Sequence, residues 1–290
     1  RNFAARCGRR HFRLEGGNPS AAGRHANDQH KINHNMKKRG LFVIASLILM
    51  LISATLQAGG LKILFIGDSI TDGNWGSGDG KPSSERTLWD MNHIYGHGFM
   101  YLCASHYLGE YPQYEYEFFN RGISGNSLYD LEKRWQEDVL DINPDVLSIL
   151  VGINDINRYL HGDRTSPFDF DAWDKKYREL LDRTRQENPN LKIVLASPFV
   201  APTGNMSENK DFGEYDKIVE RCSAIVEKIA RDYKAVYLPY RQMFNDLLQR
   251  DPTSQNTYWI WDGVHPTAAG HQRMADLWIR QVDRERILRP

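Results

Sequence analysis

Two short segments, far apart in the sequence, carry residue types that can cleave an ester. Ser69 lies in GDSIT directly after an apolar run, and Asp262 and His265 stand three residues apart in WDGVH. A serine hydroxyl is a weak nucleophile until a base removes its proton, and that base must be oriented by a third group. Asp262 can hold one ring nitrogen of His265 while the other nitrogen faces Ser69. The three side chains therefore predict acyl transfer with Ser69 as nucleophile.

The same chemistry needs donors for the negative charge that develops on the carbonyl oxygen. The candidates are the backbone N–H of Ser69, the backbone N–H of Gly125 in GISGNS, and the side-chain amide of Asn154 in GIND. Taken alone, Gly125 fits a loop with positive φ and Asn154 fits a turn cap. Because both follow apolar runs, as Ser69 does, the joint pattern favours an oxyanion hole over separate turn residues.

The segments around these candidate residues alternate between apolar runs and amphipathic stretches. The runs predict strands at 61–67, 145–152, 191–199 and 235–240, and a more exposed one at 114–120. Helical spacing of apolar residues covers 127–141, 169–188, 213–233 and 268–283. This alternation predicts an α/β domain over 59–290, a parallel sheet of about five strands with helices on both faces.

Ligands bind at the carboxyl ends of the strands in a sheet of this kind. The segments GDSIT, 120–127 and 151–156 each follow a predicted strand, and 261–271 precedes the last predicted helix. We therefore expect the four segments to meet at one edge of the sheet.

Composition narrows the classes of partner. The 290 residues are 41% hydrophobic and 26% charged, enough for a substantial core, and 37 basic residues balance 37 acidic ones. Without net charge there is no field that favours nucleic acid or an anionic membrane surface. Small-molecule or carbohydrate esters fit better as partners, and the oligomeric state stays open.

The first 58 residues are expected to lie outside the globular domain. Residues 1–35 contain no Met and no periodic apolar pattern, as in an upstream extension. Residues 36–58 combine Lys37, Lys38 and Arg39 with an apolar run and small residues ending at Ala58, the layout of a secretory signal peptide. An uncleaved anchor is the alternative, but the run is shorter than the ~20 residues of a spanning helix. We expect a secreted or periplasmic enzyme with no stable membrane insertion after cleavage.

The remaining titratable residues predict no metal or cofactor. Asp68, Asp72, Asp155 and His265 offer carboxylates and an imidazole, but no close His or Cys ligand pair accompanies them, so we interpret the carboxylates as structural. Packing is the expectation for His93, His97 and His106, and His271 is expected to face outward or to cap the last helix. Cys103 and Cys222 are either paired or two free buried thiols.

The four segments, taken in order and with their approximate spacing, closely resemble the four blocks of the SGNH subgroup of GDSL hydrolases. The resemblance covers essentially all of 59–290, and its first block reads GDSI rather than GDSL. It implies a flavodoxin-like three-layer α/β/α sandwich. It also implies Ser69 as nucleophile, His265 as base with Asp262 as its orienter, and an oxyanion hole of Ser69, Gly125 and Asn154.

Substrate contacts are expected from aromatic residues near the two catalytic segments. Trp259 and Trp261 precede His265, Trp75 follows Ser69, and His161 follows Asn154 by seven residues. Aromatic faces beside such a serine suit stacking on sugar rings. With the polar loop 201–213, they favour a short acyl ester of a carbohydrate. The alternatives are a lipid-directed esterase on the same fold, a noncatalytic carbohydrate-binding protein, and a metal-dependent hydrolase.

Overall fold

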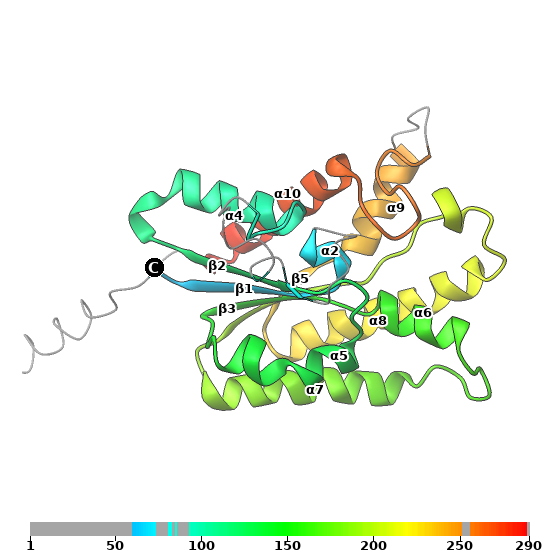
Figure 1. The fold of residues 1–290 in the computed structure, drawn as a ribbon, viewed down its shortest axis with the longest axis horizontal. Helices are drawn as coiled ribbons and strands as arrows, with labels where there is room; N and C mark the ends of the chain where they lie inside the picture. The colour runs from blue at the N-terminus through cyan, green and yellow to red at the C-terminus, as the bar shows by residue number, and fades with distance from the viewer. Residues whose placement is uncertain (1–59, 74–80, 83–84, 86–92, 251–255, 289–290) are drawn as a thin grey trace, which may run out of the picture. The chain divides into compact units, whose positions relative to one another are not determined.

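Five apolar segments form a parallel β-sheet in the order β2-β1-β3-β4-β5 (Figure 1). This computed structural model describes residues 60–73, 81–82, 85, 93–250 and 256–288. The strands are β1 (Lys62–Gly67), β2 (Glu117–Gly122), β3 (Val146–Leu150), β4 (Lys192–Ala196) and β5 (Val236–Leu238). The α/β class and the parallel five-stranded sheet predicted from the sequence are confirmed.

The register of the sheet brings three strand ends level. Gly67, the last residue of β1, pairs with Gly122 of β2 and with Leu150 of β3. Because β2 and β3 flank β1, the chain leaves all three strands at the same edge. The segments that begin with Asp68, Ile123 and Val151 therefore start side by side.

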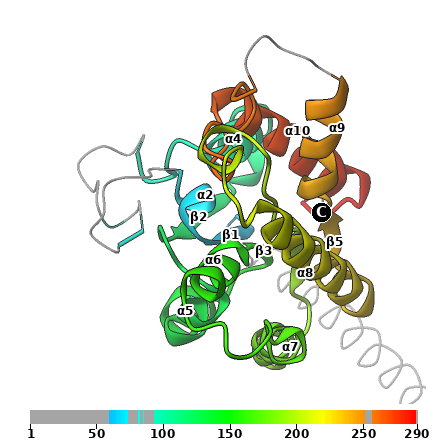
Figure 2. The same ribbon diagram turned by 90° about the vertical axis from the view of Figure 1, so that its right-hand side faces the viewer.

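Helices cover both faces of the sheet, as Figures 1 and 2 show. One face is covered by α4 (Phe99–Glu110), α9 (Tyr240–Arg250) and α10 (Ala268–Arg284). The other is covered by α5 (Leu128–Lys133), α6 (Ile153–His161), α7 (Phe170–Glu187) and α8 (Phe212–Asp232). Shorter elements connect them: α2 (Ser69–Asp72), η1 (Pro112–Tyr114), η2 (Gln136–Leu140) and η3 (Gly204–Met206). The result is the expected three-layer sandwich.

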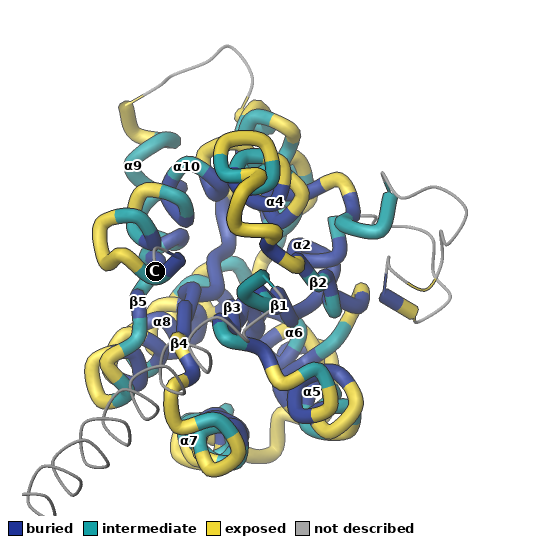
Figure 3. The backbone as a smooth tube through the Cα atoms, turned by 90° about the vertical axis from the view of Figure 1, so that its left-hand side faces the viewer, coloured by how far each residue is buried: buried dark blue, intermediate teal, exposed yellow. Residues whose placement is uncertain are grey.

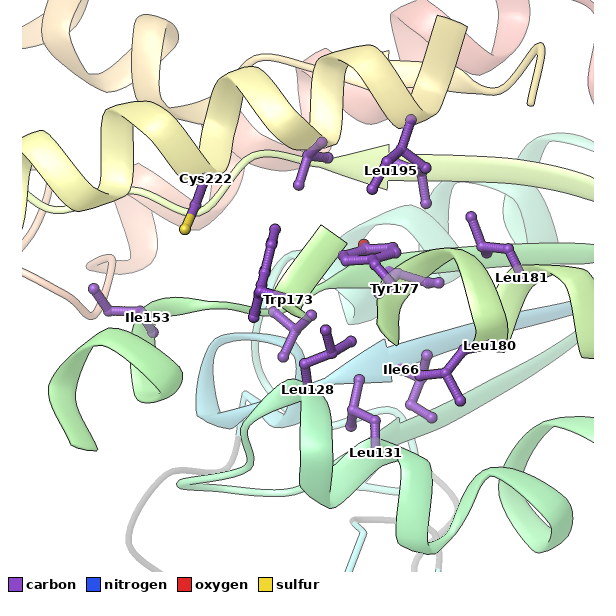
Figure 4. Close-up of a cluster of buried hydrophobic side chains, with 14 of the residues drawn as sticks. Ile66, Leu128, Leu131, Ile153, Trp173, Tyr177, Leu180, Leu181, Leu195 and Cys222 are labelled. Carbon is purple, nitrogen blue, oxygen red and sulfur yellow. The ribbon is translucent and has the colours of Figure 1, made fainter. Parts of the chain in front are cut away.

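Each face of the sheet has its own apolar core. Successive side chains of a strand point to opposite faces, so Leu64 and Ile66 of β1 join the core under α5–α8, and Ile63 and Phe65 join the other. Figure 4 shows part of the first core, and Figure 3 shows the buried strands between helices that are exposed on their outer sides. Burial on both faces explains why the strands read as continuous apolar runs.

The two cysteines of this domain belong to different cores. Cys103 of α4 packs in the core on one face and Cys222 of α8 in the core on the other, and both are free thiols. The sheet therefore separates them, which excludes the pairing that the sequence left open.

Several expected boundaries differ from the structure. The expected strand at 114–120 begins only at Glu117, because Pro112–Tyr114 forms a 3-10 turn. The expected helix at 127–141 is interrupted: α5 ends at Lys133, and a π-helical turn follows the buried Trp135, whose indole N–H donates to Thr184. The helices α4, α6 and α9 were not predicted from the sequence.

Some of the expectations fall on residues that the structure does not describe. The upstream extension, the signal peptide and Trp75 all lie there. Within the part of the chain that is described, no helix is both long enough and apolar enough to cross a bilayer.

Candidate active site

Ser69 occupies the first turn of a very short helix. The Asp68 carboxylate accepts the N–H of Ile70 at 3.0 Å and so caps α2, and Gly73, with a φ of 63°, ends it. The buried Asn120 of β2 fixes the other end of this turn, because its amide donates to the carbonyl oxygens of Thr71 and Asp72 at 3.0 and 3.2 Å. Ser69 is consequently held at the sheet edge with only 6% of its surface exposed.

A continuous hydrogen-bond chain joins the predicted nucleophile, base and acid. Ser69 Oγ lies 2.8 Å from His265 Nε2, and His265 Nδ1 lies 2.7 Å from Asp262 Oδ2. An ionised carboxylate has no proton to donate, so it accepts from Nδ1–H and leaves Nε2 to accept the serine proton. This geometry is the one that general-base activation of a serine requires.

The loop that carries Asp262 and His265 is held largely by hydrogen bonds among its own residues. Asp262 Oδ1 accepts the backbone N–H groups of Val264 and His265 at 2.9 and 2.7 Å, and Trp261 N–H donates to the carbonyl of His265. An antiparallel bridge between Ile260 and Pro266 closes the loop. We call Ile260–Pro266 the base loop.

Electrostatics keeps Asp262 ionised. Partial burial alone would raise the pKa of this carboxyl. Hydrogen bonds from the His265 ring and from the backbone of His265 and Val264 outweigh burial and lower the pKa below its ordinary value. The carboxylate is therefore charged at neutral pH and can stabilise an imidazolium on His265.

A loop between β2 and α5 carries Gly125, the predicted backbone donor to the oxyanion. We call Ile123–Ser127 the oxyanion loop. Gly125 has a φ of 78°, a region that favours glycine, and a Cβ added there would meet no atom within 4 Å, so the backbone conformation rather than crowding selects glycine. Asn154, at the start of α6, donates through Nδ2 to the carbonyl of Asn126 at 3.1 Å. The amide of Asn154 thus lies beside the oxyanion loop.

Two arginines hold the oxyanion loop by hydrogen bonds. Arg158 donates to the carbonyl of Gly125 at 2.7 Å and to Ser127 Oγ at 3.0 Å. Arg134 donates to Asn126 Oδ1 at 2.9 Å and to the carbonyl of Gly67 at 3.2 Å. Since Gly67 ends β1, Arg134 ties the oxyanion loop to the strand that leads to Ser69.

Buried carboxylates pin the neighbouring segments. Asp155 is 7% exposed, and both of its oxygens accept the N–H of Leu128 at the start of α5. Burial raises its pKa to about 7 despite these hydrogen bonds, and burial likewise raises the pKa of Asp68 to about 6. In the described part of the chain, no group of three or more His, Cys, Asp or Glu side chains is arranged to hold a metal ion.

A cavity of about 260 Å³ opens at Ser69 and His265. Trp261 forms one wall: it is 40% exposed, and its ring stacks on the His265 ring with centroids 6.0 Å apart. His271 forms another wall, and its Nδ1 accepts the backbone N–H of Phe99 at 3.1 Å. The side chain of His271 therefore caps α4, which corrects the expectation that it faces outward or caps its own helix.

Two of the four expected substrate contacts do not line this cavity. Trp259 packs against the apolar core beneath the base loop. His161 lies at the exposed end of α6, where its Nδ1 contacts the carbonyl of Asn157 at 2.9 Å within the same helix. Trp261 is the one of these four that the structure places at Ser69 among the described residues.

Comparison with known proteins shows the family of this chain. Residues 65–273 match the model of the GDSL-like Lipase/Acylhydrolase family. The chain belongs to this family. As a member of the family, this GDSL hydrolase is a carboxylic ester hydrolase.

An acetylxylan esterase of Geobacillus stearothermophilus is 31% identical to this GDSL hydrolase over 226 residues, which cover 77% of the present chain and 94% of the relative. A crystal structure from Parabacteroides merdae, described as a GDSL-like lipase, is 30% identical with a TM-score of 0.65, covering 78% of this chain and 96% of the other. Three structures of the Geobacillus esterase, 28–29% identical with TM-scores of 0.58–0.63, are catalytic mutants that replace a serine, an aspartate and a histidine.

Sequence reasoning missed the side chains that hold this hydrolase's site together. Asn120, Arg134 and Arg158 contact segments that are up to 67 residues away in the chain. The position of Asn120 at the end of a predicted strand was a usable signal, since this edge of the sheet was already expected to carry the site. The two arginines lie on helices among other charged residues, and no local pattern distinguishes them.

Proposed function

We propose that this GDSL hydrolase removes acetyl or similarly short acyl groups from carbohydrate through an acyl-enzyme intermediate. The observation that supports the mechanism most directly is the hydrogen-bond chain from Ser69 Oγ through the His265 ring to Asp262. The named activity of the Geobacillus relative supports the substrate class.

In the first half of the reaction, Ser69 Oγ attacks the carbonyl carbon of the ester while His265 Nε2 takes the hydroxyl proton. The carbonyl oxygen gains the negative charge, and the N–H groups of Ser69 and Gly125 and the Asn154 amide donate to it. The C–O bond to the sugar then breaks, and the proton passes from His265 Nε2 to the leaving sugar oxygen. An acetyl group remains on Ser69.

In the second half, a water molecule gives its proton to His265 Nε2 and attacks the acyl carbon. The tetrahedral intermediate collapses, acetic acid leaves, and the proton returns from His265 to Ser69 Oγ. Asp262 holds the imidazole in one tautomer and stabilises the imidazolium in both halves. No residue outside the site has to move a proton.

The cavity at Ser69 supports a small, polar substrate. It measures about 260 Å³, slightly below the ~300 Å³ at which typical ligand pockets begin, and the imidazoles of His97, His265 and His271 and the indole of Trp261 form part of its wall. A lipid-directed esterase is the second candidate, because the family name includes lipases. Such an enzyme would prefer long acyl chains.

The test compares p-nitrophenyl acetate, butyrate and octanoate with acetic acid release from acetylated xylan. We expect activity to fall steeply with acyl length, and Ser69→Ala to abolish it. Ser105→Ala, an exposed serine on α4, is the matched control that keeps wild-type rates. A preference for octanoate assigns the enzyme to lipids, wild-type rates in Ser69→Ala overturn the serine mechanism, and inactivation by a chelator points to a metal.

We further propose that the enzyme is exported after removal of residues 36–58. The support is the cationic, apolar and small-residue layout of that segment. Expression of the chain in a bacterial host should yield, outside the cytoplasm, a protein whose N-terminus is Gly59. An exported protein that keeps the apolar segment at its N-terminus would instead indicate an anchor.

A further inference from the structure

A second cavity adjoins the one at Ser69. It measures about 390 Å³ and lies between the first turns of α4 and α10. The two cavities share His97, Ala268 and His271 in their walls. They are therefore adjacent: Ser69 and Trp261 line only the first cavity, and Tyr101 of α4 lines only the second.

The shared wall contains one hydrogen-bond donor that the structure assigns, on His271. His271 Nδ1 accepts the N–H of Phe99, and burial lowers the pKa of this ring to about 4, with nearby His265 adding to the effect. The ring is thus neutral at pH 7 with its proton on Nε2, which makes Nε2 a donor. His97 is paired with His93, ring nitrogen to ring nitrogen, at 2.6 Å.

Each cavity has a partly exposed aromatic side chain in its wall. Trp261, 40% exposed, lines the first cavity together with Ser69, and Tyr101, 36% exposed, lines the second. Gln272 of α10 adds a side-chain amide beside Tyr101. Aromatic rings with a few hydrogen-bonding groups between them fit sugar rings, which have apolar faces and polar edges.

The charges of the lining side chains narrow the class of ligand further. Among the described residues that line the two cavities, none is Lys, Arg, Asp or Glu. An anionic headgroup or a free phosphate would find no cationic partner among these described lining residues. A neutral sugar chain needs none.

We propose that the second cavity binds an additional ring of a neutral oligosaccharide or polysaccharide whose acetylated ring lies at Ser69. Tyr101 and Gln272 would contact this additional ring, and the enzyme would act on acetylated chains in preference to single acetylated sugars. This inference rests on the proposed carbohydrate esterase function.

The experiment measures kcat/KM of the full chain on acetylated xylotetraose and on acetylated xylose, and takes their ratio. We expect the ratio to exceed one in the wild type and to fall about 5- to 10-fold in Tyr101→Ala, mainly through KM. Gln272→Ala should lower the ratio by a smaller factor. Tyr114→Ala is the matched control: Tyr114 is 37% exposed, lies on η1 and lines neither cavity. Thermal unfolding confirms that the variants are folded.

The outcomes separate this inference from the proposed function. If the wild type releases acetate from xylose and xylotetraose with equal kcat/KM, or if Tyr101→Ala leaves the ratio unchanged, the second cavity does not bind a sugar ring. If Tyr114→Ala lowers the ratio as much as Tyr101→Ala, the effect is not local to the cavity and the inference is again overturned. If the wild type hydrolyses p-nitrophenyl esters but neither carbohydrate, the proposed function itself fails.

Discussion

The base loop and the oxyanion loop are held in opposite ways. In the base loop, Asp262 accepts hydrogen bonds from the ring and backbone of His265, three residues away, and the loop is closed on itself by a bridge. The oxyanion loop depends on Asn154, Arg134 and Arg158, which reach it from α6 and from the end of α5. The base loop is thus held mainly by its own residues, with one backbone hydrogen bond from Ala201 to the carbonyl of Gly263, whereas the side chains that hold the oxyanion loop come mainly from other elements.

Because of this difference, activity should depend on single side chains to different degrees in the two loops. In the base loop a single carboxylate orients the base, so its loss should remove most of the activity. The oxyanion loop has several anchors, so removal of one anchor should leave a partly ordered loop and a graded loss. The loss of activity should therefore be larger for a substitution in the base loop than for removal of one anchor of the oxyanion loop.

The largest effect is expected from Asp262→Asn. The asparagine amide cannot hold Nδ1–H as an ionised carboxylate does, so the wrong tautomer of His265 faces Ser69, and kcat should fall by about 10⁴-fold. Steady-state hydrolysis of p-nitrophenyl acetate measures it, with circular dichroism as a control for folding. Wild-type turnover in this variant would contradict the assigned role of Asp262.

Asn154→Ala should have the next largest effect. It removes the proposed donor to the oxyanion and the hydrogen bond to the carbonyl of Asn126, and kcat should fall by about 10²- to 10³-fold with little change in KM. The same assay provides the measurement. If KM rises while kcat is maintained, Asn154 contributes to ground-state binding and is no oxyanion donor.

Arg158→Ala should have a smaller, graded effect. Its guanidinium holds the Gly125 carbonyl and Ser127 and is ion-paired with Asp130 at 2.6 Å, but the side chain is 54% exposed, so stability should change little. We expect kcat to fall on the order of 10-fold with KM maintained, because a small displacement of a positioned donor slows the reaction strongly.

Two further variants make the Arg158 result specific. Arg158→Lys keeps the charge but not the planar fork, so it should restore only part of the activity. Arg231→Ala removes an arginine of comparable exposure, 64%, that pairs with Glu227 on α8, and should retain full activity. Equal losses at Arg158 and Arg231 would mean that the effect arises from charge and not from the oxyanion loop.

The last prediction concerns stability rather than turnover, at His271, which belongs to neither loop. Its pKa is lowered to about 4 in the folded protein, so the unfolded chain binds more protons between pH 4 and 6.5. The corresponding stability is present above pH 6.5 and is lost as pH falls toward 4, by up to about 3 kcal/mol. In His271→Gln, urea unfolding at pH 4.5 and 7.5 should show a smaller pH difference than in the wild type. An unchanged difference would mean that His271 is not the titrating group.

The sequence predicted the parts of this molecule that depend on local patterns. The strands around Leu64 and Leu147 are apolar because both of their faces are buried, and the helix around Leu180 has helical apolar spacing, so their classes were predictable. The spacing of Asp262 and His265 is itself part of the geometry. We expected the candidate segments to meet at one edge of the sheet because the carboxyl ends of parallel strands lie at the same edge.

Other features could not be predicted because they depend on long-range packing. Trp259 and Trp261 are two residues apart in one aromatic segment, yet the first turns into the core and the second lines the cavity. The contacts of Arg134 and Arg158 become visible only when the fold brings α5 and α6 to the oxyanion loop. The role of His271 at the start of α4 likewise joins residues 172 positions apart.

Because the sheet separates the two cysteines, each thiol can report on exposure of a different helical layer. Burial raises the pKa of both thiols, well above the ordinary value in Cys103, so neither presents a reactive thiolate while its core is closed. Alkylation of Cys103 then reports only on exposure of the layer that contains α4, and alkylation of Cys222 on the layer that contains α8. Comparing the two rates by mass spectrometry under native conditions would show whether the sandwich unfolds as one cooperative unit or releases one layer first.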